Sequence, residues 1–391
     1  MSKSVDAVVI GGGIVGLSNA YWLARRGLSV ILVEAGDLVA GTSARCDGNN
    51  YICDTAPGEV TQAMRLAVRE MENLVKRELD EDVDWIENGM FTLAEDEEQF
   101  EQAKKQCVQK QADQVKCRLV DKKELHEAEP NLAPDIYGAI EFTEGGSLSP
   151  ILLGFALGRK IESLGGELWR FTRVTGIEKN PDGSVGKVLT DKGDILTKHV
   201  IDAAGVASPA IGRMAGVEIP VTGMKGDILV AESDVRVSNR YVCEIGYNFL
   251  RNDMALSGED NIRQKYGIGF LTEPTGANNA LIGFSKYPGT DTSTNFEVTR
   301  AMARRAIRFY PMIANVNIIR TYAGLRPWTP DHEPIISATK VPGFYVCSGH
   351  CGSGIAYGPL SGKLITQMIL GEPTDIKMDR YDLYRFKNEL L

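Results

Sequence analysis

Long hydrophobic runs are missing from this sequence of 391 residues. No stretch approaches the roughly 18 unbroken apolar residues of a membrane-spanning helix, so we expect no transmembrane segment. The first strand is expected to begin by Val5, which leaves no room for a cleavable signal peptide. The seven cysteines are odd in number and form no small-domain disulfide framework. These absences predict reduced thiols and a cytoplasmic location.

Positive charge is in deficit, because 43 Lys and Arg residues face 52 Asp and Glu residues and the net charge is −9. A negative protein has no electrostatic footprint for phosphate backbones, so nucleic acid is not an expected partner. Internal repeats and low-complexity tracts are absent as well. The remaining composition, 43% hydrophobic and 24% charged, is ordinary for a globular chain long enough for two domains.

The N-terminal segment has the pattern of a β-α-β unit. A short apolar strand at 6–10 precedes GGGIVG and an apolar-periodic helix, and Gly27 separates this helix from a second buried strand at 28–34. Parallel strands need such a helical crossover. Between Pro220 and about Pro288 the pattern changes to short strands separated by turn-forming residues, which indicates antiparallel β structure.

The expected fold class is therefore α/β (α+β overall). A Rossmann-type dinucleotide domain would be assembled from separated segments, with a mostly antiparallel β substrate domain inserted between them. We assign residues 1–80, 146–220 and 320–391 to the first domain, and residues 81–145 and 221–319 to the second.

A glycine motif carries the prediction of a dinucleotide site. Gly11, Gly13 and Gly16 form G-x-G-x-x-G directly between the first strand and the first helix. The first glycine permits a tight turn, the second lets a pyrophosphate approach the backbone, and the third allows close helix–strand packing. The helix N-terminus, at Ile14 and Val15, then presents unpaired N–H groups and a positive dipole end to the phosphates.

An acidic residue and a polar loop follow in the expected order. Glu34 ends the second strand, where an acceptor for ribose hydroxyls is needed. Eight residues later stand Thr42 and Ser43, in the loop GTSARCDGN. Here the chain resembles the D-amino-acid oxidase superfamily of flavoproteins. More narrowly, it is similar to the branch of glycine and sarcosine oxidases and of subunits of dye-linked proline dehydrogenase, opine oxidase and hydrogen cyanide synthase.

The resemblance implies that the cofactor is FAD. Thr42 and Ser43 would contact its pyrophosphate and flavin, and Gly48 and Asn49 belong to the same RCDGN loop. In later segments, the main chain of Val174 would meet the adenine, and the small residues Ala204 and Gly205 would let the cofactor pass close. The turn that opens the last helix would run beside the flavin pyrimidine ring, where the helix N-terminus stabilises negative charge on the reduced flavin. Its residues are Gly352, Ser353, Gly354 and Ile355.

The resemblance also implies the substrate-binding residues. Arg326, in the segment GLRP, would pair with the substrate carboxylate, and a planar guanidinium suits two parallel charge-assisted bonds to such a group. His350 would contact the flavin or the substrate, or only support the turn. Tyr247, Tyr266 and Trp328 would line the substrate pocket or else belong to the core.

The function implied is FAD-dependent oxidation of the C–N bond of a small amino or imino acid of the proline/hydroxyproline, sarcosine/glycine or opine type. Arg326 would orient the substrate so that hydride leaves a neutral amine for flavin N5. Positioning then carries most of the rate, because the cofactor supplies the chemistry. The particular amine, its stereochemistry, the electron acceptor and any partner subunits or homo-oligomer are left open.

Three other interpretations are open. The chain could be an FAD-binding subunit that acts mainly as an electron relay in a multi-subunit amine dehydrogenase. Cys46 and Cys53 could serve a flavin thiol/disulfide oxidoreductase, although six residues separate them instead of the usual four. A metal or iron–sulfur role for Cys347, His350 and Cys351 would leave one ligand missing, so no metal is expected.

Overall fold

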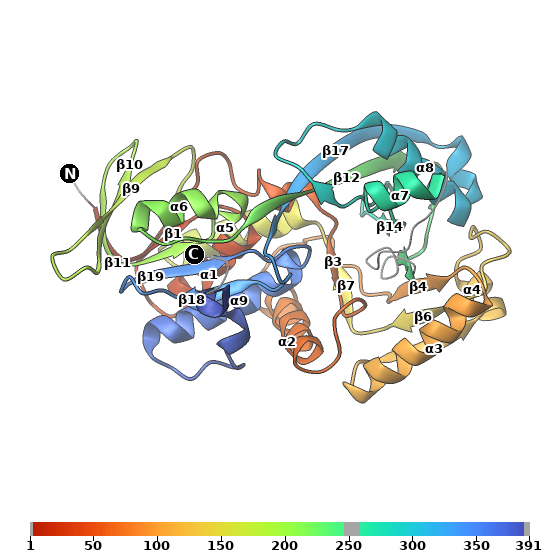
Figure 1. Cartoon of the computed structure of the whole chain (residues 1–391), viewed down its shortest axis with the longest axis horizontal. Helices are drawn as coiled ribbons and strands as arrows, with labels where there is room; N and C mark the ends of the chain where they lie inside the picture. Colours follow the sequence, from red (N-terminus) through yellow and green to blue (C-terminus); the bar gives the residue numbers. More distant parts are fainter. Residues whose placement is uncertain (1–2, 246–258, 387–391) are drawn as a thin grey trace.

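The structure is a computed structural model that describes residues 3–245 and 259–386. Two β-sheets, each with its own helices, lie next to each other along the long axis of the molecule (Figure 1). The first sheet, on the left in Figure 1, contains the beginning of the chain and packs against the last helix. The second sheet, on the right, is formed by the middle of the chain.

The first sheet is built around β1 (Lys3–Ile10), which runs parallel to its neighbours β2 and β11. Ala7 and Val9 belong to the hydrophobic core on one face, whereas Val8 and Ile10 belong to the core on the other. Burial on both faces explains the continuous apolar run. The other strands are β2 (Val30–Val33), β8 (Glu167–Trp169), β9 (Val174–Lys179), β10 (Val185–Thr190), β11 (Ile195–Asp202), β18 (Ile335–Ala338) and β19 (Phe344–Ser348).

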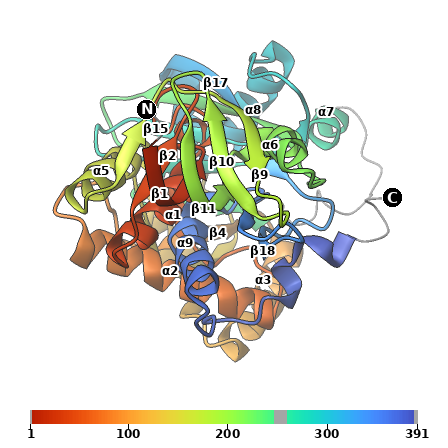
Figure 2. The ribbon, with the colours of Figure 1, turned by 90° about the vertical axis from the view of Figure 1, so that its left-hand side faces the viewer.

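Helices and a β-hairpin cover opposite faces of this sheet (Figure 2). One face carries α1 (Ile14–Arg25), α5 (Pro150–Ser163) and α9 (Gly354–Leu370), and the other carries β9, β10 and α6 (Ser208–Ala215). Helices α1 and α9 approach closely at Gly362, where a Cβ atom would lie only 2.4 Å from the Ser18 carbonyl oxygen. Close packing here fixes the N-terminal ends of both helices relative to the sheet.

The second sheet is dominated by the long antiparallel pair β12 (Thr222–Glu232) and β17 (Asn317–Trp328), in which Met224 lies opposite Arg326. All its other pairings are antiparallel too, except that β13 runs parallel to β4. Its remaining strands are β4 (Met90–Ala94), β5 (Cys117–Asp121), β6 (Gly138–Phe142), β13 (Tyr241–Glu244), β14 (Leu271–Pro274), β15 (Ala280–Gly283) and β16 (Tyr287–Pro288).

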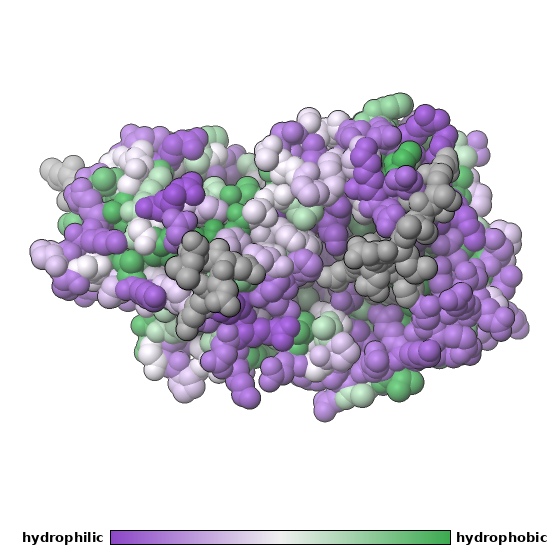
Figure 3. Space-filling view, viewed as in Figure 1, coloured by the Kyte–Doolittle hydropathy of each residue, from purple (hydrophilic) through white to green (hydrophobic). Residues whose placement is uncertain are grey.

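Further helices surround the second sheet and the junction between the sheets. These are α2 (Glu59–Asn73) with its π-helical extension Leu74–Glu78, α3 (Glu97–Ala112), α4 (Lys122–Ala128), α7 (Glu259–Lys265) and α8 (Phe296–Phe309). A small antiparallel pair, β3 (Asn49–Tyr51) and β7 (Gly145–Ser147), lies near α2. Figure 3 shows mostly hydrophilic side chains on the face formed around α3 and α4. The apolar side chains of this half instead form a buried core.

The predicted fold class is confirmed, since a sheet with a parallel centre, made of separated segments, stands beside an inserted, mostly antiparallel sheet. The division into two domains stays a prediction, and its proposed boundary at residue 320 falls inside β17. This strand pairs with β12 along its whole length, so the second sheet continues to Trp328. No helix among residues 3–245 and 259–386 is long and apolar enough to cross a membrane.

Candidate cofactor and substrate site

A cavity of about 890 Å³ lies between the two sheets. One part of its wall comes from the C-terminal ends of β1, β2 and β11, which is where open parallel sheets bind ligands. The other part comes from β12, β13 and β17 of the second sheet. One enclosure of a size usual for ligand sites therefore reaches both the glycine motif and Arg326.

The glycine motif has no room for side chains. Gly11 has φ +115°, and a Cβ atom there would lie 2.4 Å from the Ala203 carbonyl oxygen. A Cβ atom on Gly16 would lie 1.8 Å from the carbonyl oxygen of Gly11. Gly13 is the N-cap of α1 and no side chain caps the helix from that position. Side chains accept the Gly12 and Ile14 N–H groups of this turn, and the backbone of Gly13 and Val15 lies in the cavity wall at the helix N-terminus, which suits an anionic ligand.

Glu34 stands at the end of β2 with a fixed carboxylate. One oxygen accepts the Gly12 N–H at 2.6 Å and the other accepts the Gly36 N–H at 2.7 Å. The side chain lines the cavity beside the glycine turn. A carboxylate oxygen has two lone pairs, so each keeps capacity for a hydroxyl donor of a bound ribose.

The loop at 41–47 connects the glycine turn to the second sheet. The Ser43 hydroxyl accepts the Ile14 N–H at 3.1 Å, and the Thr42 hydroxyl donates to the Leu325 carbonyl at 2.6 Å. Gly324 is packed against Arg45, where a Cβ atom would lie 2.8 Å from the arginine Cβ. The loop thus lies between the N-terminus of α1 and the strand that carries Arg326.

Most of the predicted cofactor residues line this one cavity. Gly16 and Gly48 do not: the first packs against Gly11, and a Cβ atom on the second would lie 1.6 Å from the Leu148 carbonyl oxygen. Those that line the cavity are Gly11, Gly13, Ile14, Val15, Glu34, Thr42, Ser43, Asn49, Val174, Ala204, Gly205, Gly352, Ser353, Gly354 and Ile355.

The N-terminus of α9 meets the same cavity. Its N-cap, Ser353, makes no side-chain cap hydrogen bond, and Gly354 lines the wall. The preceding turn is tight, because Gly349 and Cys351 both have positive φ, at 73° and 51°. The N-terminal ends of α1 and α9 therefore meet one cavity, and neither N-cap residue makes a side-chain cap hydrogen bond, so both helix ends favour negative charge there.

His350 is a neutral residue of this turn. Its Nε2 lies 2.9 Å from the Ser361 hydroxyl, and burial lowers the pKa of the imidazole to about 4. It lines the cavity but is too weak a base to accept a proton near neutral pH.

The lowered pKa of His350 makes stability depend on pH. The unfolded histidine, with its ordinary pKa near 6.5, binds a proton below that pH while the folded one stays neutral. Stability is therefore lost as pH falls from about 6.5 towards 4, by about 2 kcal/mol at pH 5. We expect His350→Gln to remove this loss, as measured by urea unfolding at pH 7.5 and pH 5. An equal acid loss in the variant would contradict the assignment.

Arg326 reaches the cavity from β17. Its Nη1 donates to the Ser285 carbonyl at 3.0 Å and is 3.5 Å from the Lys225 carbonyl oxygen. The guanidinium lies against Gly226, where a Cβ atom would be 2.2 Å from Nη1. Among the described residues, no protein acceptor contacts Nε or Nη2, so these donors remain for a ligand.

Gly226→Ala is expected to push the Arg326 guanidinium out of position. A displacement of about 1 Å can lower catalytic efficiency on the order of 100-fold, so we expect such a fall in kcat/KM while FAD stays bound. Gly223→Ala is the matched control, because Gly223 lies on the same strand as Gly226. Its added Cβ atom would lie 2.6 Å from the Gly289 carbonyl oxygen and would not meet Arg326. Equal kinetic losses in both variants would contradict this role of Gly226.

The three aromatic residues expected in the substrate pocket or the core differ in their positions. Tyr247 lies outside the described residues. Trp328 lines the cavity, whereas Tyr266 packs against Tyr287 at a ring distance of 5.1 Å and donates to Glu297, away from the cavity. Sequence reasoning missed Tyr241, which lines the cavity from β13.

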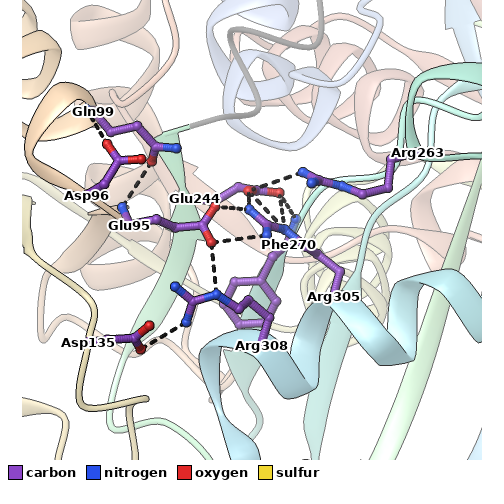
Figure 4. Close-up of polar contacts among 9 residues, drawn as sticks. All are labelled: Glu95, Asp96, Gln99, Asp135, Glu244, Arg263, Phe270, Arg305 and Arg308. Carbon is purple, nitrogen blue, oxygen red and sulfur yellow. Dashed lines mark hydrogen bonds and ion pairs between the residues drawn. The ribbon is translucent and has the colours of Figure 1, made fainter. Parts of the chain in front are cut away.

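Two acidic residues of the cavity wall were also missed, Asp47 and Glu244. Glu244 is completely buried, accepts the Phe270 N–H at 2.7 Å, and is paired with Arg305 (Figure 4). Arg263 adds a second cation at 3.6 Å. The charge of Glu244 is thus balanced by protein groups.

The cysteine alternatives find little support in the contacts. All seven cysteines are free thiols. Cys46 and Cys53 both line the cavity, but burial raises the pKa of the Cys46 thiol, and a hydrogen bond with Cys243 together with burial raises that of Cys53, whereas disulfide exchange needs a thiolate. Cys347 accepts from the Asn19 amide at 3.2 Å. Within the part of the chain that the structure describes, no three His, Cys, Asp or Glu side chains are grouped to hold a metal ion.

The residues present fit FAD. A turn that only glycine can form, the N-termini of two helices and a fixed carboxylate line one cavity, and these features suit a pyrophosphate, a flavin and a ribose. At the end of β11 the cavity is lined by Ala204 and Gly205, which are small enough to leave space for a ligand.

Comparison with known proteins agrees with this fit. Residues 6–368 match the model of a family described as FAD dependent oxidoreductase, abbreviated DAO. The chain is 28% identical over 433 residues to hydrogen cyanide synthase subunit HcnC of Pseudomonas aeruginosa, covering 100% of this chain and 98% of that one. It is 24% identical over 413 residues to mitochondrial sarcosine dehydrogenase of Homo sapiens, with 100% of this chain but only 42% of that relative covered.

A solved structure gives the same fold. The crystal structure of L-proline dehydrogenase from P. horikoshii aligns with a TM-score of 0.86 at 24% identity, and the alignment covers 100% of both chains.

Proposed function

The chain belongs to the DAO family of FAD-dependent oxidoreductases, and on this premise we propose that it oxidises the C–N bond of a small amino or imino acid. The proposal extends to substrates of the proline/hydroxyproline, sarcosine/glycine or opine type. Relatives named for sarcosine and proline oxidation support this range. The observation that carries it is the position of Arg326 in the same cavity as the dinucleotide turn.

Arg326 is proposed to bind the substrate carboxylate. Two of its donor nitrogens, Nε and Nη2, lack protein acceptors among the described residues, and together they match the two oxygens of a carboxylate. The Ser285 carbonyl and Gly226 hold the guanidinium in one orientation. FAD, when bound, supplies the acceptor for the hydride that leaves the carbon next to the substrate nitrogen. The protein's part is then binding, orientation and exclusion of water.

The test is reduction of the bound flavin without oxygen. Purified holoprotein would be mixed with sarcosine, glycine, L-proline, D-hydroxyproline or an opine, and the absorbance near 450 nm followed. We expect at least one of these amines to bleach the flavin. A flavin that dithionite reduces but that none of the amines reduces would overturn the proposed substrate class.

A partner subunit is a second proposal. The relative HcnC, covered along 98% of its length, is by name a subunit of a larger enzyme. We propose that this chain also works with another subunit that takes part in passing electrons on. Turnover of the isolated chain with an artificial dye, but not with oxygen, would support this; fast turnover with oxygen alone would contradict it.

A further inference from the structure

One carboxyl group of the cavity wall, that of Asp47, is only partly engaged by hydrogen-bond donors of other described residues. Asp47 lines the cavity, and its Oδ2 accepts the Tyr241 hydroxyl at 2.9 Å. Among the other described residues, no donor contacts Oδ1. Burial raises the pKa of this carboxyl group, and the Tyr241 hydrogen bond and the charge of Arg326 partly oppose the rise, so Asp47 and Arg326 interact electrostatically within the cavity wall.

The other acids of the cavity wall are already engaged or solvated. Glu244 is paired with Arg305 and Arg263 (Figure 4). Asp331 accepts from Arg385 at 2.7 Å, Glu333 accepts from Arg380 at 2.9 Å, and Asp54 is exposed to solvent. Glu34 is held by two backbone N–H groups at the dinucleotide end of the cavity. Asp47 is therefore the enclosed acid that retains an unshared oxygen in this part of the cavity.

A second carboxyl group lies behind Asp47. Glu273 of β14 is buried, and its Oε2 accepts the Gly48 N–H at 2.9 Å. Burial and the Asp47 charge raise the pKa of Glu273, so Glu273 is the group that keeps its proton. Burial also raises the pKa of Asp47, although the Tyr241 hydroxyl and Arg326 oppose the rise. Asp47 lines the cavity and Glu273 does not, so Asp47 is the carboxyl group of the two that a bound ammonium can reach.

We propose that Asp47 binds the substrate nitrogen while Arg326 binds the carboxylate, so that the substrate enters the cavity as a zwitterion. This rests on the proposed function and adds a group that recognises the amine. Asp47 then takes one proton: an N–H bond of the ammonium breaks, an O–H bond forms on the carboxylate, and the amine becomes neutral without any change in oxidation state. A neutral amine is the form from which hydride can leave. Tyr241 is a positioning residue, because it acts through Asp47.

The first test separates recognition of nitrogen from recognition of the carboxylate. Sarcosine and methoxyacetate have the same shape, but only sarcosine has a protonated nitrogen; L-proline and tetrahydrofuran-2-carboxylate form a second such pair. For compounds that are not oxidised, binding to the holoprotein would be measured from flavin difference spectra. For a compound that is oxidised, its KM would be used instead. We expect Asp47→Asn to weaken binding of the nitrogen-bearing member of one pair on the order of 100-fold. Binding of its oxygen isostere should weaken less than about threefold.

The second test reads the ionisation of Asp47 through Tyr241. The groups facing Asp47 are Cys46, Asp54, Tyr241, Glu273, Tyr322 and Arg326. Tyr241→Phe removes a donor that favours the carboxylate, so the acid limb of kcat/KM, or of zwitterion binding, should move up by about one pH unit. Tyr310→Phe is the matched control, because this buried hydroxyl donates to Glu129 at 3.2 Å in the second core. Its pH profile should match that of the wild type.

The outcomes distinguish this inference from the proposed function. Wild-type protein that binds a zwitterion more tightly than its isostere, yet oxidises none of the amines, would contradict the function and support the role of Asp47. Oxidation that Asp47→Asn leaves unchanged would contradict the role of Asp47 alone. If Asp47→Asn fails to hold FAD, the Tyr241→Phe profile decides, and an unmoved acid limb overturns the proposal.

Discussion

Replacing Arg326 with alanine is expected to raise KM for the oxidised amino acid by about 10²–10³-fold, because an enclosed carboxylate would lose its charged, two-point partner. The side chain approaches the cavity from β17, and its contacts are to the Ser285 and Lys225 carbonyls of the second sheet. Among the described residues, its hydrogen bonds do not include one to the glycine turn of the first sheet. The FAD content, measured from the absorbance ratio at 450 and 280 nm, should therefore stay at the wild-type value.

Two further substitutions control this result. Arg326→Lys retains the charge but not the planar pair of donors, so it should recover only part of the affinity. Arg320→Ala removes an exposed arginine from the same strand and should leave KM unchanged. Wild-type kinetics in Arg326→Ala would remove this residue from the substrate site.

The other large effect is expected at Gly16. A Cβ atom on this residue would lie 1.8 Å from the Gly11 carbonyl oxygen, and the backbone on both sides is fixed by β1 and α1. Overpacking of a tight site costs about 1–3 kcal/mol or more, and here the strain falls on the turn that would bind the pyrophosphate. We expect Gly16→Ala to reduce the FAD content of the purified protein by at least tenfold, at about 1.4 kcal/mol per factor of ten.

Gly27→Ala is the matched control for Gly16→Ala. Gly27 has φ +80° but no atom within 4 Å of its Cβ position, so alanine there adds backbone strain of about 1 kcal/mol without a clash. Added FAD should raise the thermal midpoint of the wild type and of this control, but not that of Gly16→Ala. Full FAD occupancy in Gly16→Ala would contradict the proposed close contact.

The sequence was most informative where the chemistry is local. The turn from Gly11 to Gly16 and the acid at Glu34 depend on short spacings within one β-α-β unit, and the structure brings them to one cavity as expected. Arg326 was identified only through the family resemblance, because no short-range pattern links residue 326 to a turn near residue 11. The same resemblance correctly led to FAD.

The missed residues are those whose role depends on contacts distant in the sequence. Tyr241 and Asp47 are 194 residues apart, and the tertiary fold, in which β13 pairs with both β4 and β14, brings their side chains together. Gly48 was expected to contact the cofactor, yet it packs against the Leu148 backbone. A glycine needed for a close backbone approach has the same appearance in a sequence as one needed for a ligand.

The hydrogen bond from Thr42 to the Leu325 carbonyl has a thermodynamic consequence. It joins the loop beside the nucleotide turn to the residue that precedes Arg326 on β17, so ordering either segment reduces the freedom of the other. Binding of the dinucleotide and binding of a carboxylate should then be cooperative, and by linkage each must strengthen the other by the same factor. Flavin release would accordingly slow when a carboxylate ligand is present.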